Sequence, residues 1–275
     1  MGYASLMVHL ELGRSNVNLL QIAGDLAQRF SAGVIGIAAC QPMQMVYGDG
    51  YLSGDVIEQD LAEITREMQA VEAEFRHALQ GRAESLQWRS TVDYIPLADY
   101  LAREVRAADL LITGLASGDI FDASRTLDTG ELVMQMGRPM LIVPAGVPAV
   151  RLQRVVVGWK DTREARRAAI DALPLLQRAL QVTVVEIVPE AELADSRARL
   201  ADVLMWLARH GVVAEALSAA SKGDDAAGLA TLADRLGADL VVAGAYGHSR
   251  LREWAFGGVT HDLLRQAPRC SFVSH

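Results

Sequence analysis

Two short stretches decide the fold: AADLLITGLASGD at residues 107–119 and GADLVVAGAYGHS at residues 237–249. Each has a small residue, an Ala-Asp pair, a short apolar run and a glycine, with a second glycine three or four residues later. Short apolar runs bounded by turn residues are typical of strands that are buried on both faces. The pattern therefore predicts one buried strand, ending at a glycine, in each half of the chain.

The repeat extends over whole halves of the sequence. Strand-like runs at 5–11, 32–39, 86–94, 110–114 and 138–146 correspond to runs at 154–160, 182–188, 212–219, 240–244 and 269–275. Helical patterns separate them at 16–30, 55–81 and 97–107, and again at 163–180, 191–210 and 224–236. Alternating strands and helices predict mostly parallel sheets, because neighbouring parallel strands need a crossover.

Two tandem α/β domains follow from this repeat, joined at PAGVPAVRLQ (144–153). We expect domains at 1–147 and 151–275, each Rossmann-like, with a five-stranded, mostly parallel sheet and helices on both faces. A solenoid is excluded because its repeat unit has only about 20–50 residues.

Composition narrows the class of protein. The 275 residues are 51% hydrophobic and no run reaches about 18 apolar residues, so we expect a cytoplasmic protein with no membrane span. A net charge of −8 argues against nucleic acid as a partner. Residues 1–149 have 10 Arg and no Lys against 19 Asp and Glu, a net of −9, whereas residues 150–275 have 16 basic and 15 acidic residues. An anionic ligand is therefore more compatible with the second half.

Glycines cluster after the fourth strand of the second half, in GAYGHSRLREWAFGG (244–258). In open parallel sheets, ligands bind at the carboxyl ends of strands, where the strand order reverses. Gly257 and Gly258 precede VTHDLLRQAP, a helical pattern, and a helix N-terminus favours anions through free N–H groups and its dipole. The pattern predicts an anion site, although the same glycines also suit simple tight turns.

These residues resemble the nucleotide-binding signature of the universal stress protein (UspA) family, G-x-x-G-x9-G followed by Ser or Thr. Gly244, Gly247 and Gly257 match the signature, and the resemblance covers essentially the whole chain. It implies a tandem universal stress protein with the adenine nucleotide alpha hydrolase-like fold, in which the loop and helix start hold the phosphates of ATP. An acidic residue after the first strand contacts adenine or its surroundings in such proteins.

The sequence departs from that signature in three places. Gly258 replaces the Ser or Thr that would donate a hydroxyl to phosphate, with Thr260 two residues later. Lys160 stands where the family has the acidic residue. In the first half, Gly114 and Gly118 are four apart and the following loop is acidic. We therefore expect any nucleotide in the second half alone.

The expected nucleotide-binding residues lie in two segments, after the first and the fourth strand of the second half. They are Gly158, Trp159, Lys160, Gly244, Gly247, His248, Ser249, Arg250, Gly257, Gly258, Val259 and Thr260. For Trp159 the alternative is a packing residue, and for His248 and Arg250 it is a solvated surface position.

Two functions are compatible with this sequence. The first is a stress protein that binds ATP, accompanied by Mg²⁺, as a regulatory or structural ligand in its second domain. The first domain would then be a degenerate copy that forms an intramolecular pseudo-dimer through the fifth strands, and a homodimer is compatible with the same scaffold. The alternative is a nucleotide-free interaction module. No P-loop, H-E-x-x-H or C-x-x-C motif is present, so we expect no enzyme beyond incidental slow ATP hydrolysis.

Overall fold

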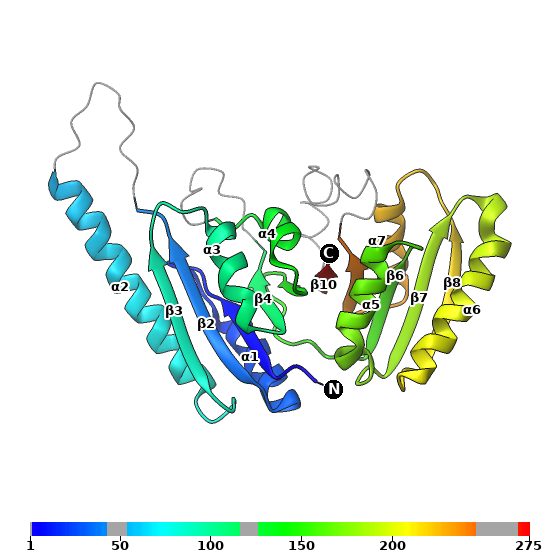
Figure 1. Cartoon of the computed structure of the whole chain (residues 1–275), viewed down its shortest axis with the longest axis horizontal. Helices are drawn as coiled ribbons and strands as arrows, with labels where there is room; N and C mark the ends of the chain where they lie inside the picture. Colours follow the sequence, from blue (N-terminus) through cyan, green and yellow to red (C-terminus); the bar gives the residue numbers. More distant parts are fainter. Residues whose placement is uncertain (1, 43–53, 116–125, 246–268) are drawn as a thin grey trace, which may run out of the picture. The chain divides into compact units, whose positions relative to one another are not determined.

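The computed structural model describes residues 2–42, 54–115, 126–245 and 269–275 (Figure 1). Contacts divide the chain into two compact units, Tyr3–Met136 and Gly137–His275, with Gly2 joining the latter. In the described ranges, no helix is long and apolar enough to cross a membrane.

The first unit contains a four-stranded sheet in the order β3-β2-β1-β4, with every neighbouring pair parallel. Right-handed crossovers place α1 and α2 on one face and α3 on the other, where α4 packs on α3. The elements are β1 (Ser5–His9), α1 (Val17–Phe30), β2 (Gly33–Cys40), α2 (Gly54–Leu79), β3 (Leu86–Val92), α3 (Leu97–Glu104), the 3₁₀ turn η1 (Val105–Ala107), β4 (Leu110–Gly114) and α4 (Thr129–Met136).

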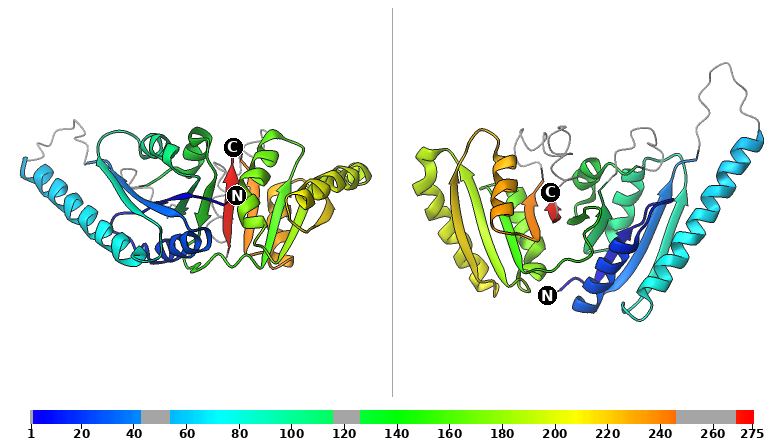
Figure 2. Two further views of the ribbon diagram at one scale, coloured as in Figure 1. Left: turned by 60° about the horizontal axis from the view of Figure 1, so that its bottom comes forward. Right: turned by 180° about the vertical axis from the view of Figure 1, so that it is seen from behind.

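The second unit contains a six-stranded sheet in the order β5-β10-β9-β6-β7-β8. The helices α5 and α7 lie on opposite sides of its strands (Figures 1 and 2). The elements are β5 (Met140–Val143), β6 (Arg154–Trp159), α5 (Arg163–Leu176), β7 (Gln181–Val188), the 3₁₀ turn η2 (Glu190–Glu192), α6 (Leu193–Arg209), β8 (Ala214–Ala220), α7 (Asp225–Arg235), β9 (Leu240–Gly244) and β10 (Cys270–Ser274).

The strand order confirms the fold predicted from the repeat. Counted within each half, the order is third, second, first, fourth in both sheets, and the sheets are parallel except for β5. As predicted, the two fifth strands lie side by side: β5 and β10 pair antiparallel, with Leu141 opposite Phe272. By contacts β5 belongs with the second unit, whereas the sequence repeat counts it with the first. The pairing gives β10 a partner on a hydrophobic edge that would otherwise be open.

The repeated Ala-Asp pair has a structural role in both units. The carboxylate of Asp109 accepts hydrogen bonds from the backbone N–H groups of Ala4 at 2.8 Å and Ser5 at 3.0 Å, at the start of β1. The carboxylate of Asp239 likewise accepts one from the N–H of Gln153 at 2.7 Å, just before β6. Each aspartate thus ties the start of the fourth strand to the start of the first, which explains why the pair recurs.

Candidate functional site

In the second sheet, the order in which strands are added reverses between β6 and β9. From β6 the chain proceeds outward to β7 and β8, and then returns to β9 on the other side of β6. Gly158 on β6 lies opposite Ala243 on β9, so the ends of these two strands are adjacent. Gly158, Trp159, Lys160 and Gly244, four of the residues expected from the sequence, therefore lie at one switch point, the usual ligand position of this fold.

Gly244 is required by a close approach of the next element. A Cβ at this position would lie 2.5 Å from the carbonyl carbon of Glu164 and 2.6 Å from the backbone nitrogen of Ala165. Real Cβ atoms essentially never approach backbone so closely. Glycine therefore lets the first turn of α5 lie directly against the end of β9, and this packing accounts for Gly244 without any ligand.

The start of α5 is well capped. The hydroxyl of Thr162 accepts a hydrogen bond from the backbone N–H of Ala165 at 3.3 Å. Glu164, in the same turn, is only 5% exposed. Burial alone would raise the pKa of its carboxyl, but hydrogen bonds from the Arg163 side chain, its own backbone amide and Thr162 hold that pKa below its usual range. A carboxylate at this position also suits the positive end of the helix dipole.

Lys160 extends to the α7 side of the sheet. Its ammonium group donates to a carboxylate oxygen of Asp225, in the first turn of α7, at 2.7 Å. The hydroxyl of Ser221 donates to the other oxygen of the same carboxylate at 2.5 Å. The Lys160 side chain is 40% exposed, so it remains accessible to an anion that competes with Asp225.

Trp159 points to the opposite face. Side chains alternate along a strand, and on the α7 side Leu229 fills the space next to Gly158, where an added Cβ would lie 2.7 Å from its Cδ2. Trp159 is 8% exposed, and its indole lies beneath α5 and α6. Trp159 and Lys160 therefore do not face one another, and a ligand that contacts Lys160 on the α7 side does not contact the Trp159 indole from that side.

The other expected residues form the rest of the glycine signature. Gly247, His248, Ser249, Arg250, Gly257, Gly258, Val259 and Thr260 lie outside the described residues. Within the described ranges, no group of three or more His, Cys, Asp or Glu side chains is arranged to hold a metal ion.

The corresponding edge of the first unit is filled by its own side chains. Strand register places His9 and Glu11 where the second unit has Gly158 and Lys160. His9 is buried, with Nδ1 3.1 Å from the hydroxyl of Thr113, and burial lowers its pKa to about 4. The Glu11 carboxylate pairs with Arg14 at 3.2 Å, and burial, partly offset by Arg14, raises its pKa.

Sequence reasoning missed Glu11. The sequence contained the necessary signal. Aligning the two Ala-Asp pairs sets the register of both first strands, and Glu11 is then the residue equivalent to Lys160 in the repeat. The two units therefore differ in charge at equivalent positions: the first has an acidic group at its switch point and the second has a basic one.

Comparisons with known proteins agree with this architecture. Residues 151–270 match the family model described as the universal stress protein family. A universal stress protein from Archaeoglobus fulgidus has a similar structure, with a TM-score of 0.76 and 12% sequence identity over 98% of this chain and 95% of that chain. A functionally unknown protein from Pseudomonas aeruginosa gives a TM-score of 0.59 and 16% identity over 99% and 92%. No protein of curated function matches the sequence. At these identities the structural likeness shows the fold, and the match to the family model lies within the second half of the chain.

Proposed function

Because residues 151–270 match the universal stress protein family model, we propose that this half binds an adenine nucleotide as a regulatory or structural ligand. ATP, with Mg²⁺ accompanying it, is the expected form. The site is the carboxyl edge where β6 and β9 end, and the first unit leaves its own edge empty of nucleotide. The role is binding in a stress response in the cytoplasm, and no catalytic step is part of the proposal.

One observation carries the proposal: the glycine signature begins at Gly244, the last residue of β9, beside the end of β6. A signature in a loop that starts at the switch point can reach a ligand there, whereas one elsewhere on the sheet cannot. Lys160 is a basic residue next to this position, and because its side chain is 40% exposed, its ammonium group can leave Asp225 and bind a phosphate. In the first unit, the carboxylate of Glu11 would repel the same phosphate.

Calorimetric titration of the full chain with ATP tests the proposal. Gly247→Val adds a branched side chain within the signature and should abolish binding. Gly118→Val makes the same change in the first-half loop, and this matched control should leave the affinity unchanged. If ATP binds the Gly247→Val variant as it binds the parent chain, the proposed site is wrong, and circular dichroism of both variants excludes misfolding.

The chain's two lysines provide a second pair of variants. Lys160→Ala removes the charge at the switch point and should weaken ATP binding about tenfold, as expected for the loss of a charge-assisted hydrogen bond of roughly 1.5 kcal/mol. Lys222→Ala removes an exposed lysine of the loop before α7 and serves as the control. If the two variants bind ATP with equal affinity, Lys160 is not part of the nucleotide site.

The nucleotide-free alternative has its own support. Gly258 lacks the hydroxyl of the family signature, and Lys160 already has a carboxylate partner. Gly258→Ser separates the two functions. In a working site the added hydroxyl should tighten ATP binding several-fold, for a hydrogen bond of about 0.5–1.5 kcal/mol. In a pure interaction module, both the parent chain and Gly258→Ser would give no binding heat.

A further inference from the structure

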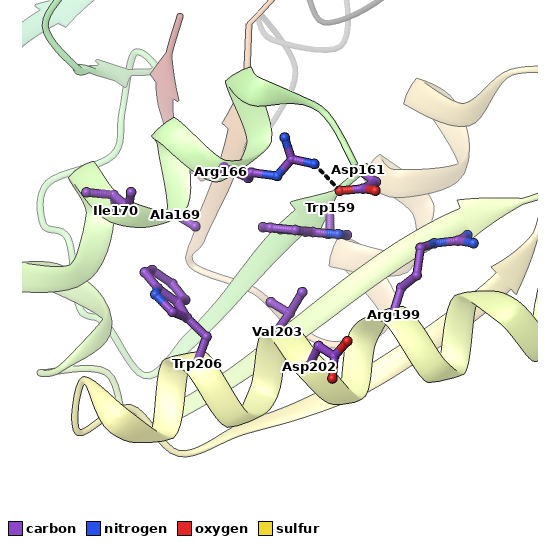
Figure 3. A pocket seen from close by; sticks show the side chains of 9 residues that line it. All are labelled: Trp159, Asp161, Arg166, Ala169, Ile170, Arg199, Asp202, Val203 and Trp206. Carbon is purple, nitrogen blue, oxygen red and sulfur yellow. Dashed lines mark hydrogen bonds and ion pairs between the residues drawn. The ribbon is translucent and has the colours of Figure 1, made fainter.

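A groove of about 370 Å³ lies between α5 and α6 on the face of the second sheet away from α7 (Figure 3). Its volume falls in the range of small-molecule sites, which begins at about 300 Å³. Four residues of α6, at helical spacing, face three residues of α5 across it. The lining residues are Trp159, Asp161, Arg166, Ala169, Ile170, Arg199, Asp202, Val203 and Trp206.

Two indole rings dominate the lining. Trp159 forms the floor, and Trp206 stands at one side (Figure 3). The centre of the Trp206 ring lies 4.7 Å from the centre of the His210 ring. Ile170, on the opposite wall, leaves 52% of its surface exposed. The groove therefore presents aromatic faces and aliphatic surface to solvent, which is the composition of a ligand site rather than of a solvated helix boundary.

The charged side chains of the groove are unevenly paired. Arg166 is paired with Asp161, and Arg199 lies 3.3 Å from the carboxylate of Glu186, a residue of β7 that is only 3% exposed. Both guanidinium groups are thus neutralised by carboxylates of the protein. In the part of the chain that the structure describes, the carboxylate of Asp202 has no hydrogen bond or ion pair. The lining together with Glu186 therefore has one uncompensated negative charge.

The equivalent positions of the first unit are occupied by different side chains. Aligning the strand registers of the two units makes Leu10 the equivalent of Trp159, and aligning the starts of α1 and α5 makes Gly24 the equivalent of Ile170. Leu10 is fully buried. Above Gly24 lies the guanidinium of Arg82, which would be 2.4 Å from an added Cβ and which pairs with Asp25 at 2.6 Å. At these two positions the first unit therefore has a buried leucine and an ion pair, where the second unit has an indole and a half-exposed isoleucine.

We propose that this groove binds a small organic cation, a substituted ammonium group on a flat apolar body. The ammonium would lie over the indoles of Trp159 and Trp206, because the faces of tryptophan rings attract cations more strongly than those of other aromatic residues. Asp202 would supply the compensating charge, and Ile170 and Val203 would contact the apolar body. This site is separate from the proposed nucleotide site and does not depend on it.

Benzyltrimethylammonium is a suitable probe, with phenylacetate as an anion of similar size. We expect the cation to quench tryptophan fluorescence of the full chain saturably, with a calorimetric dissociation constant in the millimolar range or tighter, and phenylacetate to give no saturable signal. Tighter binding of phenylacetate would overturn the proposal and indicate that Arg166 or Arg199 exchanges its partner. Absence of saturable binding of either probe would overturn it as well.

Two variants locate the site. Trp206→Ala removes a partly exposed ring, and Asp202→Asn removes the unpaired charge. Each should weaken binding of benzyltrimethylammonium about fivefold, as expected for the loss of one cation–π or ionic contact. Asp195→Asn, an exposed position of α6 outside the groove, is the matched control and should bind as the parent chain does. Equal affinities of Asp202→Asn and Asp195→Asn, with unchanged circular dichroism, would refute the assignment.

Discussion

Replacing Gly244 by alanine tests the close packing at the centre of the candidate site. The added Cβ would lie 2.5, 2.6 and 2.7 Å from three backbone atoms of Glu164 and Ala165. Backbone atoms cannot rotate away as a side chain does, so the first turn of α5 must move as a whole. We expect Gly244→Ala to lower the free energy of unfolding of the second unit by about 1–3 kcal/mol, the usual cost of overpacking. Urea denaturation followed by tryptophan fluorescence measures this loss.

The first unit supplies the matched control at Gly114, the last residue of β4. A Cβ there would lie 3.4 Å from Oε1 of Glu11 and 3.6 Å from Cδ1 of Leu19, both ordinary contacts with side chains. Gly114→Ala should therefore change the unfolding free energy by no more than about 0.5 kcal/mol, as most changes away from special features do. Equal destabilisation by the two substitutions would refute the packing of α5 against β9.

Three further predictions concern single side chains. The pKa of His9 is about 4 in the folded protein and about 6.5 when unfolded, so unfolding takes up a proton between these pH values. Stability should therefore fall as the pH drops below 6.5, by about 2 kcal/mol between pH 7.5 and pH 5, and urea denaturation of His9→Gln should lack this component. Thr162→Ala removes the cap of α5 and should cost about 1 kcal/mol in the same assay, whereas no change would show that the cap is unimportant. Burial raises the pKa of Cys270 to about 12, and Cys40 is also buried, so a thiol reagent at pH 8 should modify neither thiol until denaturant is added; rapid labelling of the native chain would contradict the burial.

The repeat in the sequence predicted the fold well because its signals are local. Apolar runs ending in glycine mark β4 and β9, and the observed strands agree with the predicted ones to within a few residues. The pairing of β5 with β10 was also predictable, because two hydrophobic fifth strands need partners at their open edges.

The site was less predictable, because its contacts join distant residues. The ion pair of Lys160 with Asp225 spans 65 positions of the sequence, and no spacing rule indicates it. The sequence grouped Trp159 with Lys160, but alternation along β6 places their side chains on opposite faces of the sheet. Gly244 was interpreted as a phosphate-binding glycine, and its contact with the start of α5 depends on tertiary packing.

Photolabelling with 8-azido-ATP tests most directly the central claim that nucleotide binds to the second half alone. The full chain is irradiated with the probe, with and without excess ATP, and labelled peptides are mapped by mass spectrometry. We predict labelling within residues 151–275 that excess ATP suppresses, and no such labelling within residues 3–136. ATP-sensitive labelling confined to residues 3–136, or no ATP-sensitive labelling at all, would contradict the account.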